Sequence, residues 1–288
     1  MIELLKVVVL GIVEGITEFL PISSTGHLIV ATALLQPAFS PALNNTFEIF
    51  IQLGAVIAVV IYYWRDLWMR VRAIPREAAA RRFWFGIVIA TLPAGIAGLL
   101  LRDFIKTVLF NPIVVAFALI IGGVALIIAE QRLGKRTAVV STSATTSLTE
   151  NQPDDDLYAV TPRQALLVGL AQVIALIPGV SRSAASIIGG MGVGLSRTTA
   201  TRFSFYLAIP TLGGATILDL LFSLDEIQTN DLVYLLIGTM VAGIVAWLSI
   251  GWLLRYVAQH TFRAFGIYRI VAGAIILLLA IVFQWTLT

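Results

Sequence analysis

The feature that most constrains this chain is a series of long apolar stretches separated by short polar ones. A helix needs about 20 apolar residues to cross the hydrocarbon core of a bilayer. Hydrophobic residues make up 59% of the chain and charged residues only 12%, whereas soluble domains carry about 25% charged residues. The sequence therefore predicts an all-α integral membrane protein with six transmembrane helices, at residues 47–64, 84–101, 112–129, 203–221, 233–254 and 267–285.

Two further apolar regions are interrupted near their middle. Residues 4–35 are broken by LPISSTG, and residues 164–195 are broken by IPGVSRS. The arms on either side of each break are about 12–17 residues long, too short for a full span. Irregular backbone at membrane depth is tolerated where it is buried in protein or lines a cavity. We therefore expect two re-entrant helical hairpins.

The distribution of basic residues predicts how the chain is oriented. Alternation of the six spans places fifteen of the nineteen Lys and Arg residues on one side, and the positive-inside rule makes that side cytoplasmic. The opposite loops carry only Arg102 and Lys106, and residues 222–232 are acidic. The fifteen are Arg65, Arg70, Arg72, Arg76, Arg81, Arg82, Arg132, Lys135, Arg136, Arg163, Arg197, Arg202, Arg255, Arg263 and Arg269.

This orientation divides the chain into two halves. The first hairpin enters from outside and the second from the cytoplasm, and three spans follow each of them. The sequence therefore predicts an inverted-topology repeat, with halves at residues 1–134 and 163–288. Residues 135–162 join the halves, and the Ser- and Thr-rich part that ends in three aspartates is expected to form a flexible cytoplasmic linker.

Several classes of function are excluded by composition. The chain has no cysteine and two histidines, so Cys-ligated metals, disulfides and multi-histidine metal sites are excluded. A net charge of +3 without a dense basic block gives no reason to expect nucleic acid as a partner. A metal would need oxygen ligands, which indicates Mg²⁺ or Ca²⁺. The lipid bilayer is the expected environment, and a homo-oligomer is left open.

The first interruption, EGITEFLPISSTGH at residues 14–27, concentrates polar groups in an apolar context. Glu14 and Glu18 are four residues apart, so a helix places both carboxylates on one face. Buried together they repel, unless one is protonated or a cation lies between them. Intramembrane acids are usually functional. We therefore favour a divalent-cation site or an acid/base pair over a solvated Glu14.

A proline turn then brings hydroxyls and an imidazole to the same place. Pro21 ends the helix, and the residues that follow it are Ser23, Ser24, Thr25, Gly26 and His27. An N-cap role for the returning helix explains one hydroxyl, but three hydroxyls beside a histidine exceed that need. His27 and Glu18 are expected to face one pocket across the turn.

The second interruption, IPGVSRSAAS at residues 177–186, has the character of an anion site. Gly179 and Ser181 suit a turn into a helix N-terminus, where free N–H groups favour negative charge. Arg182 adds a planar fork of donors that matches phosphate oxygens. The alternative is that Arg182 is a cytoplasmic anchor, which a buried tip disfavours.

Together the two tips contain the groups that phosphoryl transfer uses. These are paired acids or a metal, a hydroxyl nucleophile, an imidazole, and an arginine that stabilises charge on phosphate oxygens. Their position inside the membrane indicates a phosphate carried by a lipid.

EGITEFLPISSTGH and PGVSRS closely resemble the two signature regions of the undecaprenyl-diphosphate phosphatases of the bacitracin-resistance type. The resemblance extends along nearly the whole chain and includes FEIFIQLGAVIAVV (47–60) and FSFYLAIP (203–210). It implies an inner-membrane hydrolase that uses Mg²⁺ or Ca²⁺ and converts a polyprenyl diphosphate lipid to the monophosphate carrier for cell-wall synthesis.

The resemblance also implies roles for individual residues. Glu14 and Glu18 match the family's paired acids, Ser24 a proposed nucleophile, and His27 its neighbouring acid/base. Nucleophilic attack by His27 or by an activated water is left open. The implied metal ligands are Glu14 and Glu18, and the implied catalytic residues are Glu18, Ser24, His27 and Arg182.

The second signature implies a diphosphate-binding turn at residues 181–183. The chain departs from the family where Gly-x-Thr often follows SRS, although Ser186 keeps a hydroxyl there. The candidate substrate-binding residues are Ser23, Thr25, Gly26, Gly179, Ser181, Ser183 and Ser186. Because the first hairpin enters from outside, we expect an extracytoplasmic opening of the site.

Two other classes of protein compete with this interpretation. Inverted repeats with broken helices are common in transporters, so a transporter or flippase of a phosphorylated polyprenyl lipid is the alternative. A purely structural membrane protein ranks last, since it has little reason to bury Glu18, His27 and Arg182. Release of phosphate separates the enzyme from both.

Overall fold

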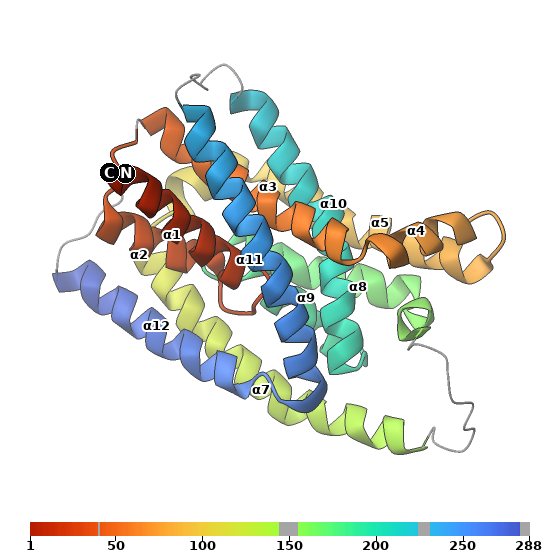
Figure 1. Cartoon of the computed structure of the whole chain (residues 1–288). Helices are drawn as coiled ribbons and strands as arrows, with labels where there is room; N and C mark the ends of the chain where they lie inside the picture. Colours follow the sequence, from red (N-terminus) through yellow and green to blue (C-terminus); the bar gives the residue numbers. More distant parts are fainter. Residues whose placement is uncertain (40, 144–154, 224–230, 283–288) are drawn as a thin grey trace.

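The computed structural model describes residues 1–39, 41–143, 155–223 and 231–282, and within these ranges every regular element is helical. Figure 1 shows the helices in chain order. The first half contains α1 (Ile2–Thr17), α2 (Ser24–Leu35), α3 (Pro41–Tyr62), α4 (Trp64–Ala73), α5 (Ala78–Leu100), α6 (Arg102–Phe104), the π-helical turn η1 (Ile105–Leu109) and α7 (Pro112–Ser143). The second half contains the 3₁₀ turn η2 (Asp155–Ala159), α8 (Pro162–Val173), the 3₁₀ turn η3 (Ile174–Leu176), α9 (Arg182–Gly192), α10 (Arg197–Ser223), α11 (Leu232–Gln259) and α12 (Arg263–Val282).

The predicted class and number of spans are confirmed. Among the described residues, five helices are long and apolar enough to cross a membrane, namely α5, α7, α10, α11 and α12. The remaining predicted span, residues 47–64, corresponds to residues 46–62 of α3, which continue into α4 after a bend of 65°. The bend has a physical reason, since α4 carries Arg65, Asp66, Arg70 and Arg72. A basic amphipathic helix is stable at the membrane surface and not in hydrocarbon.

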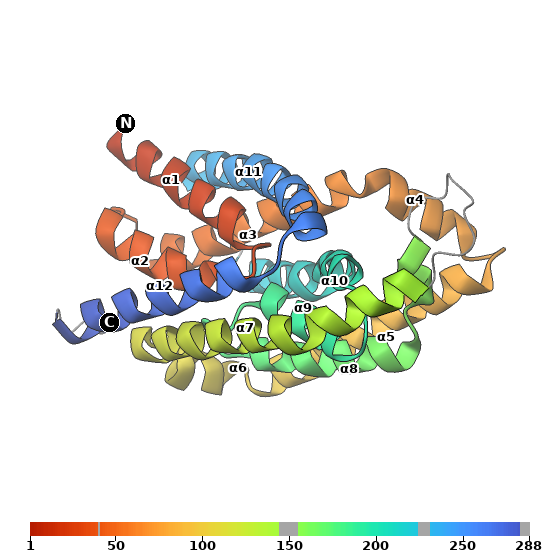
Figure 2. The ribbon, with the colours of Figure 1, turned by 90° about the horizontal axis from the view of Figure 1, so that it is seen from below.

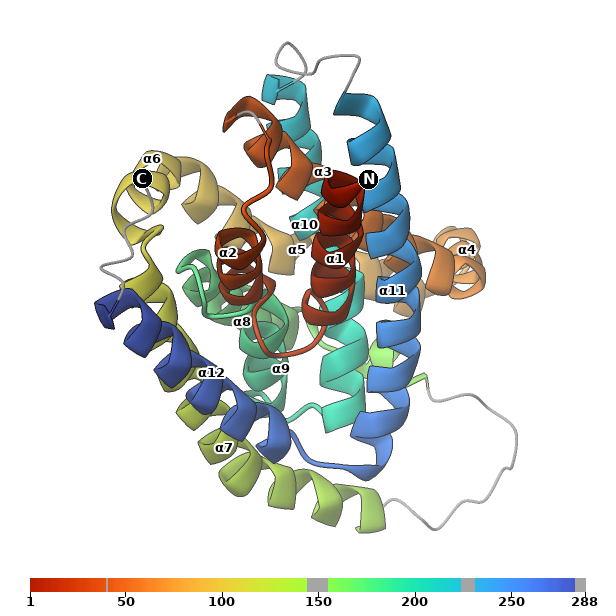
Figure 3. The same ribbon diagram turned by 60° about the vertical axis from the view of Figure 1, so that its left-hand side comes forward.

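Two short helix pairs lie at the interrupted regions, α1 with α2 and α8 with α9. Ser23 and Ser181 immediately precede the returning helices, and both have positive φ, 74° and 68°. Figure 3 shows the α1–α2 connection beside α9. The chain therefore reverses twice in the same way, and the two reversals meet. How deep these hairpins lie in a membrane stays a prediction.

The two halves are interlocked. Helix α1 packs along α11, and α8 packs along α5, so each hairpin rests on a long helix of the other half (Figures 1 and 2). A glycine permits each contact. A methyl group added at Gly11 would lie 2.9 Å from the carbonyl oxygen of Gly238, and one at Gly169 would lie 2.3 Å from that of Ala90. Such close approach of small residues is typical of helix packing in membranes.

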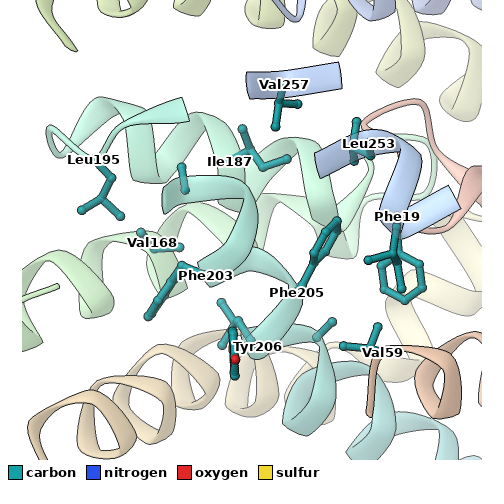
Figure 4. Packing of buried hydrophobic residues seen from close by; sticks show 14 of the residues in the cluster. Phe19, Val59, Val168, Ile187, Leu195, Phe203, Phe205, Tyr206, Leu253 and Val257 are labelled. Atoms are coloured by element: carbon teal, nitrogen blue, oxygen red, sulfur yellow. The ribbon is translucent and has the colours of Figure 1, made fainter. Parts of the chain in front are cut away.

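A buried apolar cluster supports the first tip. Phe19, which follows Glu18, is fully buried and meets Phe205 of α10 edge to face, with ring centroids 5.5 Å apart. Figure 4 shows both rings with Val59 of α3 and Leu253 of α11 in the same cluster. An aromatic pair in this geometry adds to the stabilisation from burial alone. The tip is therefore anchored in the interior, and its polar residues are held in place.

The structure describes both ends of the segment that was predicted to be a linker. Helix α7 continues through Ser143, so the first part of residues 135–162 is helical, and Pro162 already opens α8. The sequence between Gly134 and Ser143 contains no proline, so nothing in it forces the helix to end earlier. Residues 144–154 of the predicted linker lie outside the described residues.

Candidate active site

The tips of the two hairpins are in direct contact. Arg182 Nη2 lies 3.5 Å from Glu18 Oε1, and both side chains are largely buried. Ser183 Oγ donates a hydrogen bond of 2.9 Å to the carbonyl of Leu20. An acid from the first hairpin therefore pairs with an arginine from the second, although 164 positions separate them in sequence.

Glu14 and Glu18 lie on successive turns at the end of α1. The N–H of Glu18 donates to the carbonyl oxygen of Glu14 at 2.9 Å, which keeps both carboxylates on one face. The side chain of Glu14 is 1% exposed, and its Oε2 has no hydrogen-bond partner among the described residues. A buried carboxylate oxygen without a donor is costly, so this pair favours a bound cation or a proton.

Ser24 is the direct partner of Glu18. As the first residue of α2, Ser24 donates a hydrogen bond of 2.7 Å from Oγ to Glu18 Oε2. The preceding Ser23 takes the strained positive φ, and its side chain makes no capping bond. The Pro21 turn thus places a hydroxyl against a carboxylate, which is the arrangement of a nucleophile and its general base.

His27 is one turn further along α2 and bonds elsewhere. Its Nδ1 lies 2.7 Å from the carbonyl oxygen of Ser23, and its Nε2 lies 2.6 Å from the hydroxyl of Tyr268 on α12. A carbonyl only accepts, so Nδ1 carries the proton, and in a neutral imidazole Nε2 accepts from Tyr268. His27 is therefore close to Ser24 in the chain but is not its hydrogen-bond partner.

The second tip presents Arg182 at the start of α9. Gly179 has φ of 96°, and a methyl group there would lie 2.6 Å from the carbonyl oxygen of Val115. Ser181 caps α9 by accepting from the N–H of Ala184 at 3.3 Å. Arg182 Nη1 donates to the carbonyl oxygen of Ser204 at 3.2 Å, while its buried Nε has no partner within the described part of the chain. One strong donor is thus left for an anion.

Other predicted binding residues are engaged with the protein. Ser186 Oγ lies 2.6 Å from Ser204 Oγ and donates to the carbonyl of Arg182 at 2.9 Å. Gly26 faces α7, where an added methyl group would lie 3.0 Å from a methyl carbon of Leu119. Thr25 is half-buried on the first turn of α2. Ser186 therefore ties α9 to α10, and Gly26 allows α2 to pack closely against α7.

Helix α12 contributes two residues that the sequence did not single out. Tyr268 holds His27, and Arg269 is fully buried and bonds to carbonyl oxygens of both tips. The placement of Arg269 among the cytoplasmic loop bases is therefore wrong. An arginine inside the apolar stretch GIYRIVAG was the available signal, but its position near a helix start is equally typical of a surface anchor.

The residues present fit an oxygen-bound divalent cation that shares its shell with substrate. No cluster of three or more His, Asp or Glu side chains suited to a metal occurs among the described residues. Glu14 and Glu18 offer two carboxylates, and Glu14 Oε2 has no competing donor there. Mg²⁺ is commonly held by one or two carboxylates together with waters and phosphate oxygens.

Comparisons with known proteins give one family for this chain. Residues 7–275 match the family described as "Bacitracin resistance protein BacA". A protein of Deinococcus radiodurans named undecaprenyl-diphosphatase is 47% identical, and the alignment covers 93% of this chain and 92% of that protein. Undecaprenyl-diphosphatase 1 of Paraburkholderia xenovorans is 48% identical over 95% of this chain and 94% of its own length. The corresponding protein of Albidiferax ferrireducens is 47% identical, with 95% and 94% covered.

Proposed function

Because the chain belongs to the bacitracin resistance protein BacA family, we propose that it hydrolyses undecaprenyl diphosphate to undecaprenyl phosphate and inorganic phosphate. The observation that carries the proposal is the meeting of Glu18, Ser24 and Arg182 between the two tips. A hydroxyl, a carboxylate that accepts its proton, and a guanidinium are the protein groups that phosphoryl transfer needs.

The reaction begins at Ser24. Its Oγ attacks the terminal phosphorus while its proton passes to Glu18 Oε2, 2.7 Å away. The bond between that phosphorus and the bridging oxygen breaks, and undecaprenyl phosphate leaves. Water then attacks the phosphoserine, the proton returns to Ser24 Oγ, and inorganic phosphate is released. A direct attack by water that Glu18 activates gives the same products without a phosphoserine.

Arg182 stabilises the charge that develops on the phosphate oxygens. It stands at the N-terminus of α9, where the helix dipole also favours an anion. Its contact with Glu18 is 3.5 Å long, so a diphosphate oxygen competes well for the same guanidinium. The unpartnered Nε supplies a further donor without the loss of an existing bond.

The paired acids suit a divalent cation. Mg²⁺ or Ca²⁺ bound at Glu14 and Glu18 supplies neutralisation of charge on the diphosphate. Glu14 is the residue more available for this role, because both oxygens of Glu18 already have partners, Ser24 and Arg182.

His27 completes the first tip as a second proton carrier. Its Nε2 accepts from the exposed hydroxyl of Tyr268, so uptake of a proton at Nε2 requires that hydroxyl to turn and accept the hydrogen bond instead. This role supports turnover without competition with Glu18 for the proton of Ser24.

The setting of the reaction follows from the class of substrate. We place the chain in the bacterial inner membrane, with the site open to the extracytoplasmic side, where it regenerates the lipid carrier for cell-wall synthesis and supports bacitracin resistance. The absence of cysteine makes this testable, since a cysteine introduced at Thr25 is then the only thiol. Labelling by an impermeant reagent from the cytoplasmic side alone would contradict the placement.

The deciding experiment uses purified protein in vesicles with undecaprenyl diphosphate and a divalent cation. We expect phosphate release, and a transporter of phosphorylated lipid would release none. Rapid quenching with labelled substrate distinguishes the two routes, since labelled protein that disappears in Ser24→Ala supports the phosphoserine. A wild-type rate of phosphate release in Ser24→Ala would show that water, and not Ser24, attacks the phosphorus.

A further inference from the structure

Arg269 makes an unusual set of contacts for a charged residue inside an apolar helix. It is 0% exposed and is the largest of the fully buried side chains. Its guanidinium donates to the carbonyl oxygens of Pro21 at 3.1 Å, of Gly179 and Val180 at 3.0 Å each, and, at longer distance, of Ala118 and Leu119. A single side chain of α12 therefore connects both hairpin tips to α7.

These carbonyls belong to the irregular backbone of the two turns. Pro21 lies between Glu18 and Ser24, and Gly179 and Val180 lead into Ser181 and Arg182. A turn inside a membrane protein leaves carbonyl oxygens that no helix ladder satisfies, and water is scarce there. Arg269 donates to carbonyl oxygens of the first turn and of the second turn. Because one guanidinium contacts both turns, it also limits how far apart the two tips can lie.

The space for the guanidinium is built into α7. A methyl group added at Gly122 would lie 2.2 Å from Arg269 Nη2 and 2.9 Å from Cζ, and one at Gly123 would lie 3.0 Å from Arg269 Cβ. A planar guanidinium offers five donors in a fixed fork, whereas a lysine ammonium offers three on a flexible chain. The contacts therefore require arginine and two glycines opposite it.

The positive charge of Arg269 is not neutralised by the contacts that hold it. Within the described part of the chain, the hydrogen-bond partners of Arg269 are backbone carbonyl oxygens, so these contacts leave its positive charge in place beside the tips. That charge favours an anion between them. In contrast, Arg70 is buried to a similar degree but forms an ion pair with Asp66 at 3.0 Å.

We propose that Arg269 is a positioning residue that sets the spacing of the two hairpin tips and thereby the contact of Glu18 and Ser24 with Arg182. The expected effect on kcat rests on the proposed hydrolysis. The distance between the two tips can be measured whether or not the protein is a hydrolase. The guanidinium does not touch the reacting atoms in this account, and it acts through the backbone of both turns.

The spacing is tested by cross-linking in the cysteine-free chain. Cysteines at Leu20 and Ser183, two residues in contact across the tips through the Leu20 carbonyl, are joined with a short bifunctional thiol reagent in the wild-type, Arg269→Ala, Gly122→Ala and Arg70→Lys backgrounds. We expect efficient cross-linking in the wild-type and Arg70→Lys backgrounds and a clear loss in the other two. Equal cross-linking in all four would overturn the inference, whether or not the protein is a phosphatase.

The kinetic arm uses proteins without added cysteines. A displacement of about 1 Å at a reacting group costs about a hundredfold in rate, so we expect a loss of that size in kcat for Arg269→Lys and Gly122→Ala, while Arg70→Lys retains activity. Guanidinium added to Arg269→Ala should restore part of kcat, whereas an equal concentration of ammonium should not. Wild-type kcat in Arg269→Lys would refute the positioning role, while an inactive wild type would refute the proposed hydrolysis alone.

Discussion

The two hairpin tips turn with the same backbone conformation, since Ser23 has φ of 74° and Ser181 has φ of 68°. The next residue begins the returning helix in each, and there the tips differ. At the first tip this residue is Ser24, bonded to a carboxylate, and at the second it is Arg182, which faces that same carboxylate. One backbone device thus presents a nucleophile from one side and an anion-binding group from the other.

The difference explains why neither tip is a site alone. The first tip collects acids and hydroxyls, which by themselves repel a diphosphate. The second tip offers positive charge and free N–H groups but no base. Each tip therefore supplies the groups that the other lacks, and the two are in contact at Glu18, which pairs with Arg182.

The largest effect should come from breaking the second tip's contribution. Arg182→Ala removes the charge that stabilises the transferring phosphoryl group, and arginines in that role contribute about 10³- to 10⁵-fold. We expect kcat for phosphate release to fall by about 10⁴-fold. The control is Arg102→Ala, since Arg102 pairs with Asp219 away from the tips. Retained activity in Arg182→Ala would show that the second tip is structural.

A somewhat smaller loss is expected when the base at the first tip is neutralised. Glu18→Gln keeps the shape of the side chain but cannot take the proton of Ser24, and general base catalysis contributes about 10²- to 10⁴-fold. We expect kcat to fall by about 10³-fold. Glu3→Gln serves as the matched control, because Glu3 is on the same helix and pairs with Lys6 outside the site. If both variants kept wild-type kcat, Glu18 would not be the base.

Glu14 separates metal binding from proton transfer within the same tip. Glu14→Gln removes one of two carboxylates, so we expect a higher concentration of Mg²⁺ or Ca²⁺ for half-maximal activity. At saturating cation, kcat should recover further than in Glu18→Gln. Metal titrations of phosphate release measure both values. An unchanged metal requirement would remove Glu14 from the cation site.

A moderate effect should follow from loss of the contact between α12 and the first tip. Tyr268→Phe deletes the hydroxyl that donates to His27 but keeps the ring that stacks on the imidazole. A neutral hydrogen bond contributes about 1 kcal/mol, so we expect a loss of kcat of about five- to tenfold, with little change in thermal unfolding. Wild-type kcat would show that the bond has no part in turnover.

The smallest effect concerns the stability of the two turns themselves. Ser181 caps α9 through its hydroxyl, whereas Ser23 makes no such bond. Loss of an N-cap costs about 1 kcal/mol, so Ser181→Ala should lower the free energy of unfolding by about that amount. Ser23→Ala should lower it less, since the strained φ remains and no cap is lost. Thermal unfolding in detergent compares the two variants. Equal decreases in the free energy of unfolding would show that the two serines contribute equally to the stability of their turns.

Much of this arrangement could be predicted because it depends on local pattern. The length of the apolar stretches correctly indicated an all-helical membrane protein and its spans. The four-residue spacing of Glu14 and Glu18 indicated a shared face, and the proline indicated that the chain turns back after Glu18. The bend after Tyr62 was missed, because an apolar count does not show where the helix turns.

The partners of Ser24 and Arg269 could not be predicted, for a different reason. Ser24 has both Glu18 and His27 within reach in sequence, and only the contact of His27 with Tyr268, 241 positions away, decides between them. Arg269 bonds to a residue 248 positions earlier. Such contacts depend on how helices of the two halves pack, which the pattern along one helix does not encode.

The interlocked packing has a consequence for how the protein is made. Helix α1 leaves the ribosome long before α11, the helix along which it packs, has been synthesised. The first tip therefore exists before Arg182 is made, and α11 follows only after a further helix, α10. The contacts between the two halves can therefore be completed only when the last helices have been made.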